Sequence, residues 1–190
     1  MAAIEFRTAR LCLRQWRDAD RAPFAAMNAD PRVREFFYPT ILARADSDRM
    51  VDICQAHIEQ RGWSFWAVET LATHQFIGFV GLGVPSHALP FLPCVEIGWR
   101  LAQAHWGQGY ATEAARAALR VGFEQLALDE IVAFTAAPNV RSSAVMAKLG
   151  MEPDGRFEHT AVPVGHALRE HLLYRLSRER WLALSAQQGQ

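Results

Sequence analysis

The chain has 190 residues, 51% of them hydrophobic and 21% charged, with 20 basic and 20 acidic side chains. This length suits one domain with a sizeable core, and the composition excludes an intrinsically disordered chain. Because the formal charge is zero and no dense basic run occurs, we expect no nucleic-acid partner. The N-terminus lacks the apolar stretch of a signal peptide, and no segment has the roughly 18–20 apolar residues of a membrane span. These features predict a cytoplasmic protein without membrane contact.

The cysteines and histidines show neither a disulfide framework nor a metal-ligand motif. The three cysteines are odd in number and far apart, and two of them, Cys12 and Cys94, lie in apolar runs where we expect buried, inert thiols. His159, His166 and His171 are close enough along the chain to converge in space. Without a ligand motif they predict no metal site.

Hydrophobic alternation and capping signals predict the elements of the first half of the chain. Alternation is typical of strands, whereas proline and glycine mark the ends of helices. We expect a strand over 8–16, a helix from Asp18 or Asp20 to about Pro31, a second helix from Asp46 or Ser47 to Gly62, and strands over 64–70 and 76–84. A loop that contains three prolines follows over 85–93.

The second half continues as an alternation of strands and helices. We expect a strand over 94–101, a glycine-rich turn, a helix to about Gln125, a strand over 130–135, a short helix over 139–149, strands over 153–159 and 168–176, a terminal helix over 178–184, and a frayed tail over 185–190. No internal repeat or linker interrupts this order. The pattern therefore predicts a single α/β domain.

The turn between the strand at 94–101 and the following helix is the most informative segment. Gly107 and Gly109 allow a tight turn and a close approach of the backbone to a ligand. Free N–H groups and the positive end of a helix dipole then meet at one point, which favours a bound phosphate. A dinucleotide site is an alternative, with Thr112 in the place of the third glycine and Glu130 as the acidic residue. The second alternative is a plain connection between a strand and a helix, without a ligand.

A second segment, from Asn139 through Lys148-Leu149-Gly150 to Met151, follows the next strand. The order and spacing of this segment and four other motifs resemble the GNAT superfamily of acyl-CoA-dependent N-acyltransferases. The other motifs are the opening Thr8-x-Arg10-Leu11-x-Leu13-Arg14, Gly78-Phe79-Val80-Gly81, Glu96-Ile97-Gly98-Trp99, and Trp106-Gly107-x-Gly109-Tyr110-Ala111-Thr112-Glu113-Ala114. The branch of ribosomal-protein N-terminal acetyltransferases is the most similar. The resemblance covers about residues 4–177.

This resemblance implies a fold and a cosubstrate. The fold is a single N-acetyltransferase domain over 1–190, with a mixed α/β (α+β) sheet of about seven strands, helices on both faces, and a splay between the fourth and fifth strands. The pyrophosphate of acetyl-CoA would lie on the N–H groups of the glycine turn, and pantetheine would run beside the strand at 94–101. The implied cosubstrate residues are Trp99, Leu101, Trp106, Gly107, Gln108, Gly109, Tyr110, Ala111, Thr112, Asn139 and Ser142, without a metal. Helix N-capping is an equal alternative for Ser142 and is compatible with ligand contact for Asn139.

Two positions depart from the family pattern. Ala104 stands where relatives usually have Gln or Arg, but backbone donors do most of the phosphate binding, so we expect binding to survive. Met146 stands where many relatives have the Tyr that reprotonates the CoA thiolate, and a thioether cannot donate a proton. Either another group serves, or the thiolate leaves unassisted.

Glu96 is the best candidate for a general base. Strand alternation separates it from Trp99 and Leu101, in an apolar strand beside the splay. The alternative is a structural ion pair with Arg100 on the same face. His171 and Glu170 on the last strand are the next candidates.

Together these features predict acetyl transfer from acetyl-CoA to a primary amine by direct attack on the thioester. The acceptor is a protein N-terminal α-amine or a small-molecule amine, and the protein is a monomer or a homodimer. An acyl-CoA-binding sensor with weak or no turnover is the alternative. Among the aromatic residues of the first half, Tyr38 and Trp66 are candidates to line the acceptor pocket, and core packing explains the others.

Overall fold

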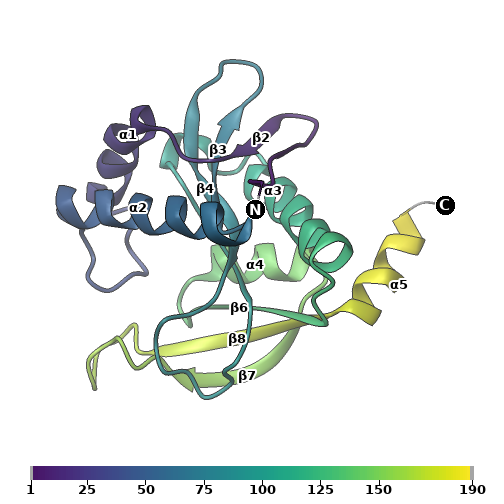
Figure 1. Ribbon diagram of the computed structural model, residues 1–190. Helices are drawn as coiled ribbons and strands as arrows, with labels where there is room; N and C mark the ends of the chain where they lie inside the picture. Colours follow the sequence, from purple (N-terminus) through teal and green to yellow (C-terminus); the bar gives the residue numbers. More distant parts are fainter. Residues whose placement is uncertain (1, 189–190) are drawn as a thin grey trace.

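Eight strands form one open mixed sheet in the computed structural model, which describes residues 2–188 (Figure 1). The strands are β1 (Phe6–Arg7), β2 (Leu11–Arg14), β3 (Phe65–Thr70), β4 (Phe76–Gly83), β5 (Glu96–Leu101), β6 (Glu130–Ala136), β7 (Glu152–Glu158) and β8 (Glu170–Ser177). Their spatial order is β1-β2-β3-β4-β5-β6-β8-β7, and β5–β6 is the parallel pair within these residues. The mixed α/β fold predicted from the sequence is confirmed.

The helices are α1 (Asp18–Ala29), α2 (Arg44–Arg61), α3 (Tyr110–Arg120), α4 (Val140–Lys148) and α5 (Arg178–Gln188). A 3-10 turn, η1 (Gln103–His105), precedes α3, and a π-helical turn, η2 (Val121–Gln125), continues it. As predicted, α1 ends just before Asp30-Pro31 and α2 ends at Gly62, whose φ of +87° suits a left-handed cap. The helix α2 begins two residues before the predicted start.

The prediction of one strand over 8–16 was wrong in detail. The Thr8 hydroxyl accepts a hydrogen bond from the N–H of Leu11 at 3.0 Å, which closes a turn. Phe6–Arg7 then pairs back on Cys12–Leu13, so the chain forms a short hairpin and the sheet has eight strands rather than seven. The predicted fraying over 185–188 was also wrong, because α5 extends to Gln188, whereas 189–190 lie outside the described residues.

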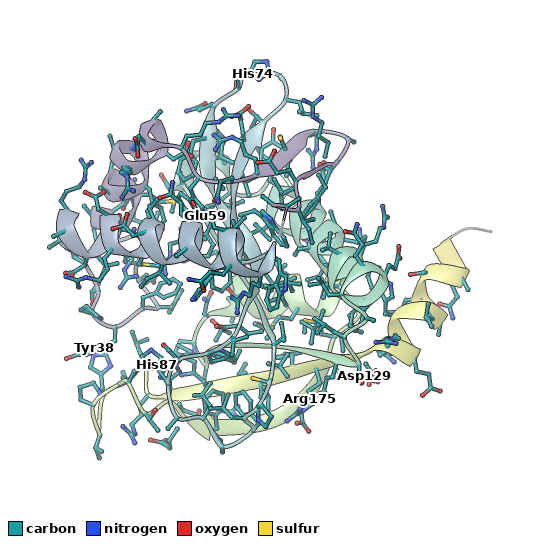
Figure 2. The ribbon with its side chains drawn as sticks, viewed as in Figure 1. Tyr38, Glu59, His74, His87, Asp129 and Arg175 are labelled. Atoms are coloured by element: carbon teal, nitrogen blue, oxygen red, sulfur yellow. The ribbon has the colours of Figure 1, made fainter. Side chains whose placement is uncertain are left out.

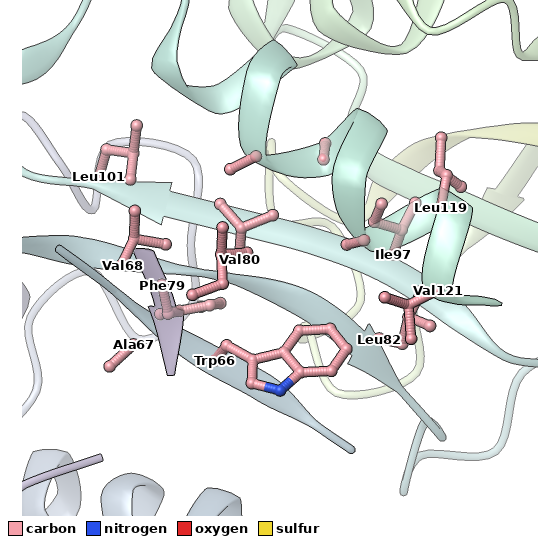
Figure 3. Close-up of a cluster of buried hydrophobic side chains, with 14 of the residues drawn as sticks. Trp66, Ala67, Val68, Phe79, Val80, Leu82, Ile97, Leu101, Leu119 and Val121 are labelled. Carbon is pink, nitrogen blue, oxygen red and sulfur yellow. The ribbon is translucent and has the colours of Figure 1, made fainter. Parts of the chain in front are cut away.

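Helices cover both faces of the sheet. On one face, the Phe24 ring of α1 packs on Phe79 of β4, with ring centroids 6.0 Å apart. On the other face, α3 and η2 bury Ala114, Ala115, Ala118, Leu119, Val121 and Phe123. Figure 3 shows part of this packing, with Leu119 of α3 and Val121 of η2 beside Val80, Leu82 and Ile97 of the sheet. Burying the alanine-rich stripe of α3 brings its N-terminus to the end of β5.

The strands β5 and β6 separate soon after they meet. Their one register pair is Glu96 with Val132, whose N–H donates to the Val95 carbonyl at 2.9 Å. Just past the other end of β5, the N–H of Ala102 donates to the Ile77 carbonyl of β4 at 2.9 Å. Because backbone polar groups alternate along a strand, those of Trp99 and Leu101 must point away from β4, toward the gap. The predicted splay therefore lies between β5 and β6.

The thiols differ from expectation. Cys54 is buried, whereas Cys12 and Cys94, which we expected to be buried, are only partly so. Cys12 lies on β2 near the hairpin edge and Cys94 lies in the approach to β5, and a strand near an edge is covered on fewer sides. None of the described helices is long and apolar enough to cross a membrane.

Candidate functional site

A cavity of about 370 Å³ lies where the end of β5, the N-termini of α3 and α4, and the segment after α1 meet. All of the predicted cosubstrate residues except Gln108 line it. The structure adds residues that sequence reasoning did not select: Val33, Phe36, Phe37, Arg100, His105, Arg141, Ala144, Val145 and Lys148. The tertiary fold therefore brings two distant motifs, the glycine turn and the start of α4, to one cavity.

The glycine turn presents a row of unused backbone donors. Gly107 and Gly109 have φ of +73° and +79°, which L side chains rarely adopt. Gly109 is the N-cap of α3 and provides no side-chain cap. Within residues 2–188, the N–H groups of 107–112 find no hydrogen-bond acceptor. They therefore form a concave set of donors at the positive end of a helix, which is suited to a phosphate.

The N-terminal hairpin holds this turn in place. The Arg10 Nε donates to Glu113 Oε2 at 2.6 Å, and its Nη1 donates to the Gln108 carbonyl at 3.0 Å. Thr8 Oγ1 donates to Glu113 Oε1 at 2.6 Å, and the Arg10 guanidinium lies 4.5 Å from the centre of the Tyr110 ring. Gln108 thus supports the turn through its backbone rather than lining the cavity. The opening Thr-x-Arg motif acts as a clamp on the first turn of α3.

The edge of β5 supplies a second set of backbone groups. The Leu101 carbonyl accepts a hydrogen bond from Trp106 Nε1 at 2.8 Å, which fixes the indole at the mouth of the gap. The Leu101 N–H and both backbone groups of Trp99 point into the splay, where β6 no longer pairs with them. An extended ligand with amide groups can bind there like an added strand.

Asn139 and Ser142 begin α4. Asn139 Oδ1 accepts from the Ser142 N–H at 3.3 Å, and Asn139 Nδ2 donates to Thr135 Oγ1 at 2.9 Å and Ser142 Oγ at 3.0 Å. Asn139 is therefore the helix cap, and Ser142 orients it. Both side chains also line the cavity, so capping and contact with a ligand are compatible.

Cationic side chains add to the positive potential of the cavity. Arg141 lies over the Trp106 ring, 4.6 Å from its centroid, and pairs with Glu35 at 2.7 Å. Lys148 lines the cavity at the other end of α4. Sequence reasoning missed both, although their position in the segment after Asn139 was a usable signal for an anionic ligand.

Glu96 lies outside the cavity lining, at the vertex where β5 and β6 still pair. Its face of the sheet also carries Phe65 and Gly83. Burial raises the pKa of its carboxyl to about 7. No ion pair or hydrogen bond joins the carboxylate to another side chain between residues 2 and 188. The alternative ion pair with Arg100 is wrong, because Arg100 turns to α1 and donates to Asn28 Oδ1 at 2.7 Å.

The other candidates for acid–base chemistry lie elsewhere. His171 is nearly buried on β8, 4.8 Å from the His159 ring, and burial lowers its pKa. Glu170 is exposed and pairs with Arg156 at 2.5 Å. Met146 is 2% exposed and packs in the core, so its thioether does not face the cavity. Within the described chain, these three residues contribute nothing to the cavity lining.

Neither of the two aromatic candidates lines the cavity. Trp66 is fully buried, and its indole donates to the Ile4 carbonyl at 2.7 Å. Tyr38 is 47% exposed and packs edge-on against His166, at the margin of the segment between α1 and α2 (Figure 2). The aromatic rings of this segment that do face the cavity are those of Phe36 and Phe37.

The histidines converge in part. The ring of His159 lies between those of His171 and His87, with centroids 4.8 and 5.5 Å away, whereas His166 packs on Tyr38. Burial, with smaller contributions from His171, His87 and Arg169, lowers the pKa of His159 to about 4. Among residues 2–188, no group of three or more His, Cys, Asp or Glu side chains is arranged to hold a metal ion.

Comparisons with known proteins agree with this geometry. Residues 10–152 match the family model described as the acetyltransferase (GNAT) domain. The chain is 34% identical to the uncharacterized protein YkkB of Bacillus subtilis over 145 residues. This aligned segment spans 76% of this chain and 83% of YkkB. It is 38% identical over 91 residues, 47% of this chain and 38% of its relative, to the FsC-acetyl coenzyme A-N(2)-transacetylase of Aspergillus fumigatus.

A solved structure shares the whole fold. The acetyltransferase (GNAT family) from Bacillus anthracis superposes with a TM-score of 0.76 at 23% identity, over 93% of this chain and 99% of that one. The family model accounts for most of the chain, including the glycine turn and the start of α4. The chain therefore belongs to the GNAT family of acetyltransferases.

Proposed function

We propose that this protein transfers the acetyl group of acetyl-CoA to a primary amine by direct attack of the amine on the thioester. GNAT acetyltransferases use acetyl-CoA as cosubstrate. The observation that carries the proposal is the cavity that joins two sets of unused backbone donors. One set is the N–H row of residues 107–112, and the other is the open edge of β5 at Trp99 and Leu101.

Each set suits one part of the cosubstrate. The N–H row binds the pyrophosphate, with Arg141 and Lys148 adding positive charge nearby. The β5 edge binds the pantetheine amides in the manner of an added strand. The Leu101 N–H is then available to polarise the thioester carbonyl. These roles hold the thioester beside the splay, where proximity to the amine supplies much of the rate.

Glu96 acts as the general base in this proposal. A carboxyl whose pKa is raised to about 7 takes a proton efficiently near neutral pH. One proton of the acceptor ammonium passes to Glu96 and on to solvent, directly or through a water. The neutral nitrogen then attacks the carbonyl carbon, the C–S bond breaks, and the second amine proton neutralises the departing thiolate. Met146 is buried and cannot serve as the acid, so the thiolate leaves without a dedicated donor.

The acceptor is a protein N-terminal α-amine or a small-molecule amine. Assignment to the ribosomal-protein N-terminal acetyltransferase branch, a homodimeric or monomeric state and a cytoplasmic location stay predictions. A panel of amines with acetyl-CoA, followed by free-thiol release, tests the reaction. Tight binding of acetyl-CoA without thiol release from any acceptor would instead indicate a sensor.

Two variants test the site. Ala111→Leu places a larger side chain in the cavity and should weaken acetyl-CoA binding at least tenfold in calorimetry, whereas Ala117→Leu, later on α3 and outside the cavity lining, should not. Glu96→Gln should lower kcat/KM by about 10²–10⁴. Full kcat/KM at every pH in the Gln variant would exclude Glu96 as the base.

A further inference from the structure

Two buried arginines have no carboxylate partner within residues 2–188. Of the three arginines that are less than a tenth exposed, Arg14 donates to Asp20 at 2.7 Å and to Glu69 at 2.8 Å. Arg34 and Arg100 are 3% and 8% exposed. Among the described residues, neither guanidinium has a carboxylate within ion-pair distance. An uncompensated buried charge is strongly destabilising, so such a pair calls for an explanation.

The partners that these two arginines do have are neutral. Arg34 donates to the carbonyls of Pro39 and Thr40, and Arg100 Nη1 donates to Asn28 Oδ1 at 2.7 Å. Both guanidinium groups lie on the Phe37 ring, 4.9 and 4.2 Å from its centroid. Burial lowers the pKa of Arg34 to about 10 and that of Arg100 to about 9, so both remain cations near neutral pH. Neutral oxygens and a ring face orient these cations without neutralising them.

The unused donors of Arg100 lie on one edge of its guanidinium. The Nε atom is buried without a hydrogen-bond acceptor, and Nη2 makes no hydrogen bond with any residue that the structure describes. Nε–H and Nη2–H point the same way and match the two oxygens of a carboxylate. Arg100 and Phe37 both line the cavity. Arg100, which lines the cavity, therefore carries two adjacent donors that no described residue uses.

This site is separate from the phosphate donors. Successive side chains of a strand point to opposite faces, so Arg100 lies on the face of β5 that α1 covers, opposite Leu101. The glycine turn follows β5 and η1, with its N–H row at the start of α3. The pyrophosphate bound at residues 107–112 would leave the Arg100 edge unfilled. An anion at Arg100 therefore belongs to the other substrate.

We propose that Arg100 binds a carboxylate of the acceptor, so that the preferred acceptor is an amine that also carries a carboxylate. This inference rests on the proposed function, because it names the class of the acceptor amine. An amine substrate that lacks a carboxylate would leave the buried Nε–H of Arg100 without a hydrogen bond. The loss of that hydrogen bond discriminates against such a substrate.

Matched acceptors test this inference. Glycine and L-phenylalanine are each paired with their own carboxamide. Each carboxamide lacks the carboxylate and also has a less basic α-amine, so kcat/KM is compared per unprotonated amine. The wild-type protein should favour each carboxylate at least tenfold in kcat/KM by thiol release. Arg100→Gln should abolish the preference and leave the KM for acetyl-CoA within twofold, and Arg100→Lys should restore part of it. Arg120→Gln, exposed on α3, is the control and should keep the preference.

The outcomes separate this inference from the proposed function. Turnover that treats carboxylates and carboxamides alike would overturn the inference and leave acetyl transfer standing. A large rise in the KM for acetyl-CoA in Arg100→Gln, with an unchanged acceptor preference, would assign the anion to the cosubstrate and also overturn it. If no amine releases thiol, the function fails, and calorimetry of the wild-type protein with CoA then decides the inference. Carboxylates should bind at least tenfold more tightly than their carboxamides, and equal binding would overturn it.

Discussion

Glu96 should make the folded protein less stable as the pH rises. Burial raises the pKa of its carboxyl from the ordinary 4.5 to about 7. Between these values the folded state binds more protons than the unfolded state, so the free energy of unfolding falls as the pH rises through this window. At about 1.4 kcal/mol per pH unit, the difference corresponds to at most about 3 kcal/mol. Because Glu96 keeps partial exposure, we expect about half of that loss.

Glu96→Gln removes this titration and keeps the shape of the side chain. Urea unfolding at about pH 5 and about pH 8.5 should show the variant gaining stability over the wild type at the higher pH, by about 1–2 kcal/mol. The control is Glu59→Gln on the exposed face of α2 (Figure 2), where the difference should stay within about 0.5 kcal/mol. A difference between Glu96→Gln and the wild type that is the same at both pH values would refute the argument.

Three further predictions concern the scaffold of the site. Gly109→Ala, at a φ of +79°, should lose about 1–2 kcal/mol in urea unfolding, and an unchanged midpoint would contradict the strain. Glu113→Gln weakens the clamp that Thr8 and Arg10 form on α3, so the KM for acetyl-CoA should rise about tenfold at constant kcat in steady-state kinetics. A fall in kcat at constant KM would count against the clamp. Met146→Ala should cost about 2–5 kcal/mol of unfolding free energy because the side chain is 2% exposed, and near-wild-type stability would be inconsistent with that burial.

Three ionisable groups on or near β5 have no ion-pair partner among residues 2–188. Glu96 on β5, and Arg100 and Arg34 on the α1 side, are ionisable groups that burial disfavours in their charged form. Arg14, in contrast, has two carboxylates of its own. Unpaired buried charges lower stability, and they persist where a ligand completes them. This contrast with Arg14 is why we propose roles in the reaction for Glu96 and Arg100.

Signals that depend on neighbouring residues were predictable from the sequence. The glycine turn before α3, the Asn139 cap of α4, and the ends of α1 and α2 all follow from backbone preferences of a few adjacent residues. The hairpin at Phe6–Leu13 was missed because its turn depends on a hydroxyl contact rather than on a glycine or proline.

The sequence by itself determined the donor half of the site, because a strand, a glycine turn and a helix in succession create phosphate-binding N–H groups wherever they occur. Only the tertiary structure decided which side chains surround it. Arg10 and Glu113 are 103 positions apart in the sequence, and Arg100 and its partner Asn28 are 72 positions apart. Such contacts depend on how helices pack against both faces of the sheet, and no local preference encodes them. The same packing leaves Arg100 without a carboxylate partner among the described residues, so the acceptor class that we propose depends on the fold and not on a local sequence signal.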